Sequence, residues 1–128
     1  MKKIYHLLLL IVVIICSACQ AKTDIRSIEG ETVYQMLQNK EDFVLVDVRE
    51  VDEYKEGHIP HSMLIPLGTI ESDFQSKVPS KDKKIVIYCR SGRRSKEAYA
   101  KITALGYTDV YDLGGIQDWS YDIEKDEK

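Results

Sequence analysis

A single cysteine stands where an apolar run meets a segment rich in arginine and glycine. Residues 85–88 are Ile-Val-Ile-Tyr, Cys89 follows them, and residues 90–95 are Arg-Ser-Gly-Arg-Arg-Ser. A parallel strand would carry Cys89 to the carboxyl edge of a sheet, where α/β proteins place their sites. The peptide N–H groups of a curled loop, the N-terminal end of the next helix and nearby cations all favour a thiolate. We therefore expect Cys89 to be a nucleophile that can hold an anionic adduct.

The segment after Cys89 is unlike the surroundings of a purely structural cysteine. A small buried cysteine at a strand end is common, but it requires no cluster of three arginines and a glycine. Guanidinium groups match small oxyanions. The sequence leaves open which arginine would guide a substrate, and a solvated charged loop is the alternative. Ser95 is a candidate cap for the following helix. The candidate substrate-binding residues are Arg90, Ser91, Gly92, Arg93, Arg94 and Ser95.

These residues resemble the active-site loop of rhodanese-type sulfurtransferases. Further marks of that family occur in its usual order: Asp-Val-Arg at 47–49, Gly-His-Ile-Pro at 57–60, Leu-Gly-Gly-Ile at 113–116, and Trp119. The resemblance spans residues 25–121. It implies that Cys89 takes a sulfane sulfur from thiosulfate or a persulfide donor, becomes a persulfide, and passes the sulfur to a thiol, or to cyanide in a test tube. It implies no metal and no organic cofactor.

The length of the loop separates two chemistries. Four residues lie between Cys89 and Arg94, and cysteine phosphatases, including rhodanese-like ones, have one residue more. The longer loop fits a tetrahedral phosphate or arsenate, and the shorter one fits a single sulfur atom. The resemblance therefore favours sulfur transfer over a phosphatase or arsenate reductase. The other alternative is a persulfide carrier or sensor for a partner protein, because Cys89 depends on an outside acceptor.

Two supporting residues and two histidines complete the candidates. Asp47 is predicted either to hydrogen-bond the loop or to cap the next helix, and a buried pair with Arg49 is compatible with both. His58 is predicted to be a hydrogen-bonded structural residue, and His61 to be exposed. Together with Cys89, these histidines form no convincing zinc set.

Strand-like and helix-like segments alternate along the chain, which predicts a parallel sheet with helices on both faces. The family resemblance implies a rhodanese-like fold with five strands. The expected strands are 25–28, 43–46, 63–65, 85–88 and 110–111. The expected helices are 31–38, 50–56, 70–78 and 95–105. Gly114 and Gly115 are expected to let the backbone pass close to the active-site side, and Trp119 to anchor the core or border the pocket.

The bulk composition fits one globular domain. The chain has 128 residues, 44% hydrophobic and 30% charged, with a net charge of −3. This length allows one domain. The charge balance offers no basic excess for nucleic acid. The expected partners are a small sulfur donor and a thiol acceptor, with a sulfur-acceptor protein as a further candidate.

The first 18 residues predict an export signal. Lys2 and Lys3 precede an apolar run at 7–15, and small residues precede Cys19. This resembles a bacterial lipobox with the lipid on Cys19, although Cys16 stands where an aliphatic residue is usual. The run is shorter than the roughly 20 residues of an ordinary membrane span, and ordinary secretion or an uncleaved anchor are the alternatives.

The expected organisation follows from that processing. It comprises a signal peptide at 1–18, a tether at 19–24, the rhodanese domain at 25–121 and a charged tail at 122–128 that should fray. We expect an extracytoplasmic lipoprotein anchored to a membrane. In the processed chain Cys89 would be the one free thiol, with no cysteine in the same chain to pair with it.

Overall fold

The computed structural model describes residues 24–127, whose centre is a parallel sheet with strand order β2-β1-β3-β4. The strands are β1 (Val44–Asp47), β2 (Met63–Leu64), β3 (Ile85–Cys89) and β4 (Val110–Gly115). The predicted signal peptide, Cys19 and the rest of the tether up to residue 23 lie outside the described residues. Within 24–127, none of the helices has the length and hydropathy needed to cross a bilayer.

The expected fifth strand at 25–28 is reduced to one parallel bridge, so the prediction of a five-stranded sheet is wrong. Ser27 pairs with Asp112 of β4, and two backbone hydrogen bonds of 2.7 and 3.0 Å flank that pair. β4 bulges directly afterwards, because Leu113 is skipped in its pairing with β3. A bulge ends regular pairing, and the described sheet therefore has four strands.

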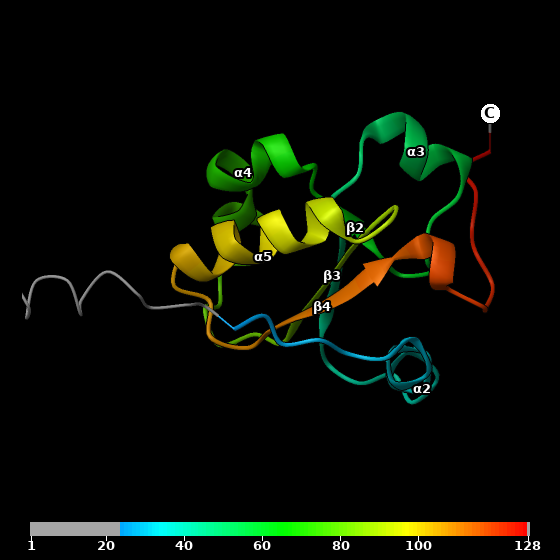
Figure 1. Cartoon of the computed structure of the whole chain (residues 1–128), viewed down its shortest axis with the longest axis horizontal. Coiled ribbons are helices and arrows are strands. Elements are labelled where there is room, and N and C mark those ends of the chain that lie inside the picture. Colours follow the sequence, from blue (N-terminus) through cyan, green and yellow to red (C-terminus); the bar gives the residue numbers. More distant parts are fainter. Residues whose placement is uncertain (1–23, 128) are drawn as a thin grey trace, which may run out of the picture.

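Helices cover both faces of the sheet, as predicted (Figure 1). α4 (Ile70–Lys77) and α5 (Arg93–Ala104) lie on one face, and α2 (Gly30–Gln38) lies on the other. The short α3 (Val51–Glu56) follows β1. The 3₁₀ turn η1 (Leu67–Thr69) precedes α4, and the 3₁₀ turn η2 (Ile116–Asp118) follows β4. The site therefore rests on a sheet held between two helical layers.

β3 brings Cys89 to its position. All five residues of β3 are buried. Ile85, Ile87 and Cys89 join the core under α4 and α5, whereas Val86 and Tyr88 join the core under α2. This alternation follows from the two-residue period of a strand. Cys89 is thus the last strand residue on the α5 face, at the carboxyl edge of the central strand.

The C-terminal residues are tied to the domain and do not form the free tail that was expected. His58 and Glu124 form an antiparallel bridge, with two backbone hydrogen bonds of 2.8 Å. The backbone N–H of Asp126 donates to a carbonyl of α3 at 3.2 Å. We call residues 119–126 the C-terminal strap. Charge composition alone predicted fraying, but these backbone bonds hold the strap against α3.

Candidate active site

The sulfur of Cys89 lies inside a closed loop. β3 ends at Cys89 and α5 begins at Arg93, so residues 90–92 make the turn. The backbone N–H of Gly92 donates to Cys89 Sγ at 3.0 Å. Gly92 has a φ of 104°, in the left-handed region that favours glycine. Cys89 is only 1% exposed. The loop therefore curls over the sulfur and presents a peptide N–H to it.

Ser95 has a different place from the predicted cap. α5 begins at Arg93 and its N-cap is Gly92, with no side-chain capping bond. Ser95 is fully buried within the first turn, and its hydroxyl donates to the Gly92 carbonyl at 3.1 Å. The helix starts earlier than expected because the left-handed Gly92 turns the chain directly into it. Ser95 therefore stabilises the loop through this hydrogen bond and does not cap the helix.

β4 passes so close to the loop that Gly115 has no room for a side chain. A Cβ at this position would lie 2.4 Å from the Arg90 carbonyl oxygen and 2.8 Å from the Ser91 Cα. Both contacts are with backbone, which cannot rotate away as a side chain can. The sequence-based expectation that the backbone passes close to the active site is confirmed for Gly115, whereas a Cβ at Gly114 would meet nothing within 4 Å.

We expect Gly115→Ala to destabilise the domain by about 1–3 kcal/mol, because overpacking forces the loop backbone to shift. The measurement is the free energy of unfolding in urea. Gly68→Ala is the matched control, since a Cβ there meets nothing within 4 Å; its effect should stay within about 0.5 kcal/mol. Equal stability of the two variants would show that the loop tolerates a side chain at Gly115.

Asp47 and Arg49 form a buried ion pair at the end of β1. Their exposed fractions are 0% and 5%. Arg49 Nε lies 3.0 Å from both carboxylate oxygens of Asp47, and Nη2 lies 2.8 Å from Oδ2. Nη2 also donates to the Gly57 carbonyl at 2.6 Å. Within residues 24–127 the Asp47 carboxylate bonds to Arg49 and not to the loop, while Glu50 caps α3.

Arg94 is joined to α3 by a two-point ion pair with Glu53. Arg94 Nη1 and Nη2 each lie 2.8 Å from one carboxylate oxygen. Glu53 also accepts the Glu50 backbone N–H at 2.9 Å, as part of a capping box. The hydrogen bond from Arg94 is the main cause that lowers the pKa of Glu53 to about 2. The pair fastens the first turn of α5 to α3.

Glu53 is a residue that the sequence analysis did not select. Its partner, Arg94, lies 41 positions away along the chain. The residues next to Glu53 in the sequence indicate only a short polar helix. The spacing of Glu50 and Glu53 matches a reciprocal cap. That spacing was a usable signal for the start of the helix, but not for the contact with Arg94.

We expect Glu53→Gln to cost about 1 kcal/mol at neutral pH, because glutamine keeps the cap but loses the charge. The folded-state pKa of Glu53, about 2, lies below its usual value of 4.5. The pair therefore stabilises fully above about pH 4.5 and progressively less as the pH falls towards 2. Urea titrations should show the gap between the two proteins closing over that interval. A gap that stayed constant would mean the carboxylate charge is not involved.

Beside the loop lies a groove of about 520 Å³, which we call the loop groove. Arg90 lies on its loop side, while Glu53 and Glu56 line it from α3. The other wall is the C-terminal strap, with Trp119 and Tyr121. Trp119 is half-buried and packs against the α2-side core, so it serves as both anchor and pocket border. The groove gives small molecules a place next to the cysteine loop.

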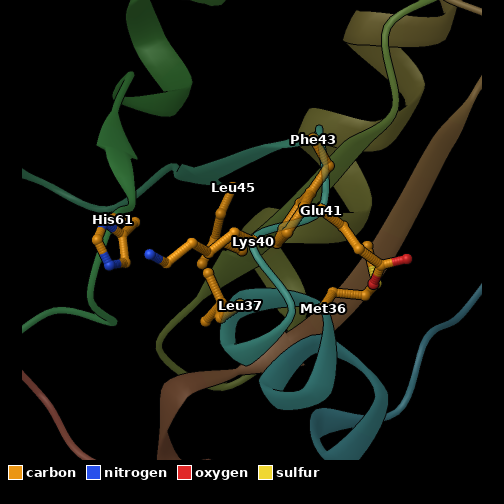
Figure 2. Close-up of a pocket in the computed structure, with 7 residues that line it drawn as sticks. All are labelled: Met36, Leu37, Lys40, Glu41, Phe43, Leu45 and His61. Atoms are coloured by element: carbon orange, nitrogen blue, oxygen red, sulfur yellow. The ribbon is translucent and has the colours of Figure 1, made fainter.

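His58 and His61 have the places predicted for them. His58 is 5% exposed, its Nδ1 is bonded to the Tyr54 carbonyl at 2.8 Å, and its ring stacks on Tyr54. His61 is exposed and lines a separate hollow of about 240 Å³ beside α2. Figure 2 shows Lys40 extending towards His61 there. No loop residue lines that hollow, and across the described chain no group of three His, Cys, Asp or Glu residues is placed to hold a metal.

The chain resembles known proteins over most of its described length. Residues 29–122 match the family model of the rhodanese-like domain. A protein of Allochromatium vinosum named "Sulfurtransferase" is 40% identical over 97 residues, which cover 75% of this chain and 89% of that protein. The thiosulfate sulfurtransferase PspE of Escherichia coli is 33% identical over 73 residues, covering 57% and 70%. A solved structure described as "rhodanese with anions from E. coli" matches with a TM-score of 0.61 and 30% identity, covering 65% and 98%.

Proposed function

Because the chain belongs to the rhodanese-like domain family, we propose that it transfers a sulfane sulfur from thiosulfate or a persulfide donor to a thiol acceptor through a persulfide on Cys89. The observation that carries this proposal is the closed loop around Cys89, whose sulfur accepts the Gly92 N–H at 3.0 Å. The sulfurtransferase names of the two relatives described above support it. The shorter loop between Cys89 and Arg94 favours sulfur over phosphate or arsenate as the bound group.

The proposed reaction has two displacement steps. In the first, the Cys89 thiolate attacks the outer sulfur of thiosulfate, the sulfur–sulfur bond of thiosulfate breaks, and sulfite leaves with the electron pair. The persulfide that remains on Cys89 carries negative charge on its outer sulfur. Peptide N–H groups of the loop stabilise that charge as an oxyanion hole stabilises an oxyanion. In the second step an acceptor thiolate, or cyanide in an assay, removes the outer sulfur and restores the Cys89 thiolate.

Arg90 is the arginine best placed to guide an anionic donor. Arg94 is bound to Glu53 through both terminal nitrogens, whereas Arg90 and Arg93 are exposed. Of these two, Arg90 follows Cys89 directly and lines the loop groove. A guanidinium at that point attracts thiosulfate without first breaking an ion pair within the domain.

We expect Arg90→Gln to raise the KM for thiosulfate about tenfold, the loss expected for one charged hydrogen bond. Steady-state kinetics with varied thiosulfate and saturating cyanide measure this effect. Arg93→Gln is the matched variant, because Arg93 is also exposed and the change removes the same charge outside the loop groove. A larger rise in KM for Arg93→Gln would reassign donor binding to Arg93.

The experiment that tests the function is the intact mass of the purified protein after incubation with thiosulfate, followed by addition of cyanide. We expect one added sulfur atom on Cys89, its loss to cyanide, and repeated turnover. Stoichiometric loading without turnover would indicate a persulfide carrier or sensor. Phosphate release from an aryl phosphate without sulfur loading would indicate a phosphatase and overturn the proposal.

We also propose that the domain is held at a membrane outside the cytoplasm through lipid on Cys19. The support is the sequence alone: a positive start, an apolar run and small residues before Cys19. Cell fractionation of the full chain tests this, with Cys19→Ala expected to release the protein from the membrane fraction or leave it unprocessed. Membrane association and processing that were the same in both proteins would refute lipid attachment at Cys19.

A further inference from the structure

The loop groove contains two opposite charges that the rest of the domain leaves available. Of its four charged lining residues, Arg49 and Glu53 are engaged in the ion pairs described above. The other two, Arg90 and Glu56, have no ion-pair partner in the part of the chain that the structure describes. Arg90 is adjacent to Cys89 in the chain. A cation therefore lies beside the reactive loop, and an anion lies on the α3 wall.

Glu56 lines the groove from α3. It is the last residue of α3, one helical turn beyond Glu53, and it also lines an adjoining surface hollow with Lys125 and Asp126 of the C-terminal region. Residues three apart on a helix share a face, so Glu53 and Glu56 form one continuous acidic edge. Because Glu53 is neutralised by Arg94, the available negative charge of that edge is on Glu56.

The strap gives the groove a preformed apolar wall. Tyr121 stacks on Tyr34 of α2 with 3.9 Å between ring centroids, and Trp119 meets Tyr121 edge-on at 5.0 Å. The bridge between His58 and Glu124 fixes the far side of the strap. Aromatic faces suit both methylene groups and an ammonium ion. The wall therefore gives a short hydrocarbon body apolar surface to pack against.

We propose that the loop groove is the acceptor subsite and that it selects aminothiols, which combine a thiol, a short apolar body and a protonated amine. This inference rests on the proposed sulfur transfer at Cys89. The thiolate end would lie on the Arg90 side and the ammonium end would face Glu56, so that ligand and groove have complementary charges. A volume of about 520 Å³ is within the range of small-molecule sites. A thiol that ended in a carboxylate would instead meet the like charge of Glu56.

The transfer itself needs no additional reagent. The acceptor thiolate attacks the outer sulfur of the Cys89 persulfide, and a new sulfur–sulfur bond forms on the acceptor. The bond between the outer sulfur and Cys89 Sγ breaks, and its electron pair returns to Sγ. The outer sulfur keeps its negative charge, so the acceptor leaves as a persulfide anion and the Cys89 thiolate is regenerated.

Three thiols that differ mainly in their end group test the proposal: cysteamine, 2-mercaptoethanol and 3-mercaptopropionate. The protein is loaded with sulfur from thiosulfate, and each thiol is added while the loss of the added sulfur is followed by intact mass. Intrinsic thiol reactivity differs among the three, so the quantity compared is the cysteamine to 3-mercaptopropionate rate ratio in wild type and in Glu56→Gln. We expect this ratio to fall about three- to fivefold in Glu56→Gln, as for one partly exposed ion pair.

Asp52→Asn is the matched control, because it removes the same charge from the same exposed helix outside the groove. Its rate ratio should equal that of wild type. An unchanged ratio in Glu56→Gln, or an equal fall in Asp52→Asn, would overturn the acceptor assignment. In either case normal loading of Cys89 would leave the proposed function standing. Failure of the wild-type protein to load sulfur would instead refute sulfur transfer itself.

Discussion

Cys89→Ser is expected to reduce thiosulfate:cyanide sulfur transfer to the rate of the uncatalysed reaction and to abolish the added sulfur mass. A serine hydroxyl is not ionised at neutral pH and forms no persulfide, so both displacement steps lose their nucleophile. The fold should persist, because serine is close to cysteine in volume and its oxygen can accept the Gly92 N–H that now reaches Sγ. Turnover and unfolding in urea should be measured on the same preparation.

The other cysteines of the chain make this variant a sharp test. Cys16 and Cys19 remain in the full chain when Cys89 is replaced. If sulfur still loads onto Cys89→Ser, peptide mapping of the added mass would locate it at one of those positions. That outcome would contradict the assignment of Cys89 as the sulfur carrier, whereas an unloaded and folded variant supports it.

The sequence predicts the central part of the site well because that part is local. An apolar run, a cysteine, a glycine-containing turn and a helical pattern follow one another within residues 85–104. Each of these segments has its own backbone preference, which is set by neighbouring residues and does not depend on distant contacts. β3 and α5 accordingly lie close to where the sequence indicates, and Gly92 makes the left-handed turn between them. The main local error is the start of α5, which begins at Arg93 and not at Ser95.

The sequence predicts less where contacts join distant residues. Glu53 and Arg94 are 41 positions apart, and nothing in the sequence of either segment pairs them. The same holds for the bridge between His58 and Glu124, because a run of charged residues at a terminus usually indicates a solvated tail. Only the fold brings these segments together, and with them the walls of the loop groove.

The missing fifth strand has a related cause. Residues 25–28 have a strand-like composition, but a strand exists only where a neighbour supplies a continuous ladder. The available neighbour is β4, which bulges at Leu113 just after Asp112. That bulge comes shortly before Gly115, where the close approach to the loop leaves no room for a side chain. The geometry that places β4 beside the active site therefore also limits pairing at the edge of the sheet.

Asp47→Ala is expected to lower the free energy of unfolding by about 3–5 kcal/mol, the usual result of breaking a buried ion pair by removing one partner. Arg49 would stay 5% exposed while losing its carboxylate partner, with only the Gly57 carbonyl left among its described bonds. A domain of this size has a total stability of roughly 5–15 kcal/mol, so the loss should be obvious in a urea titration. The double variant Asp47→Ala with Arg49→Met should recover part of it, because no buried charge then remains.

Asp42→Ala provides the matched control, since it breaks the ion pair of an exposed carboxylate with Lys83. Exposed pairs contribute about 0–1 kcal/mol, so this variant should differ little from wild type. Both changes remove one carboxylate that is paired with one cation, and the contrast reflects the burial of Asp47 and its larger number of hydrogen bonds. Similar losses for Asp47→Ala and Asp42→Ala would mean that Arg49 reaches solvent once its partner is gone. In that case the Asp47–Arg49 pair would not be what holds the end of β1 to Gly57 and the groove wall.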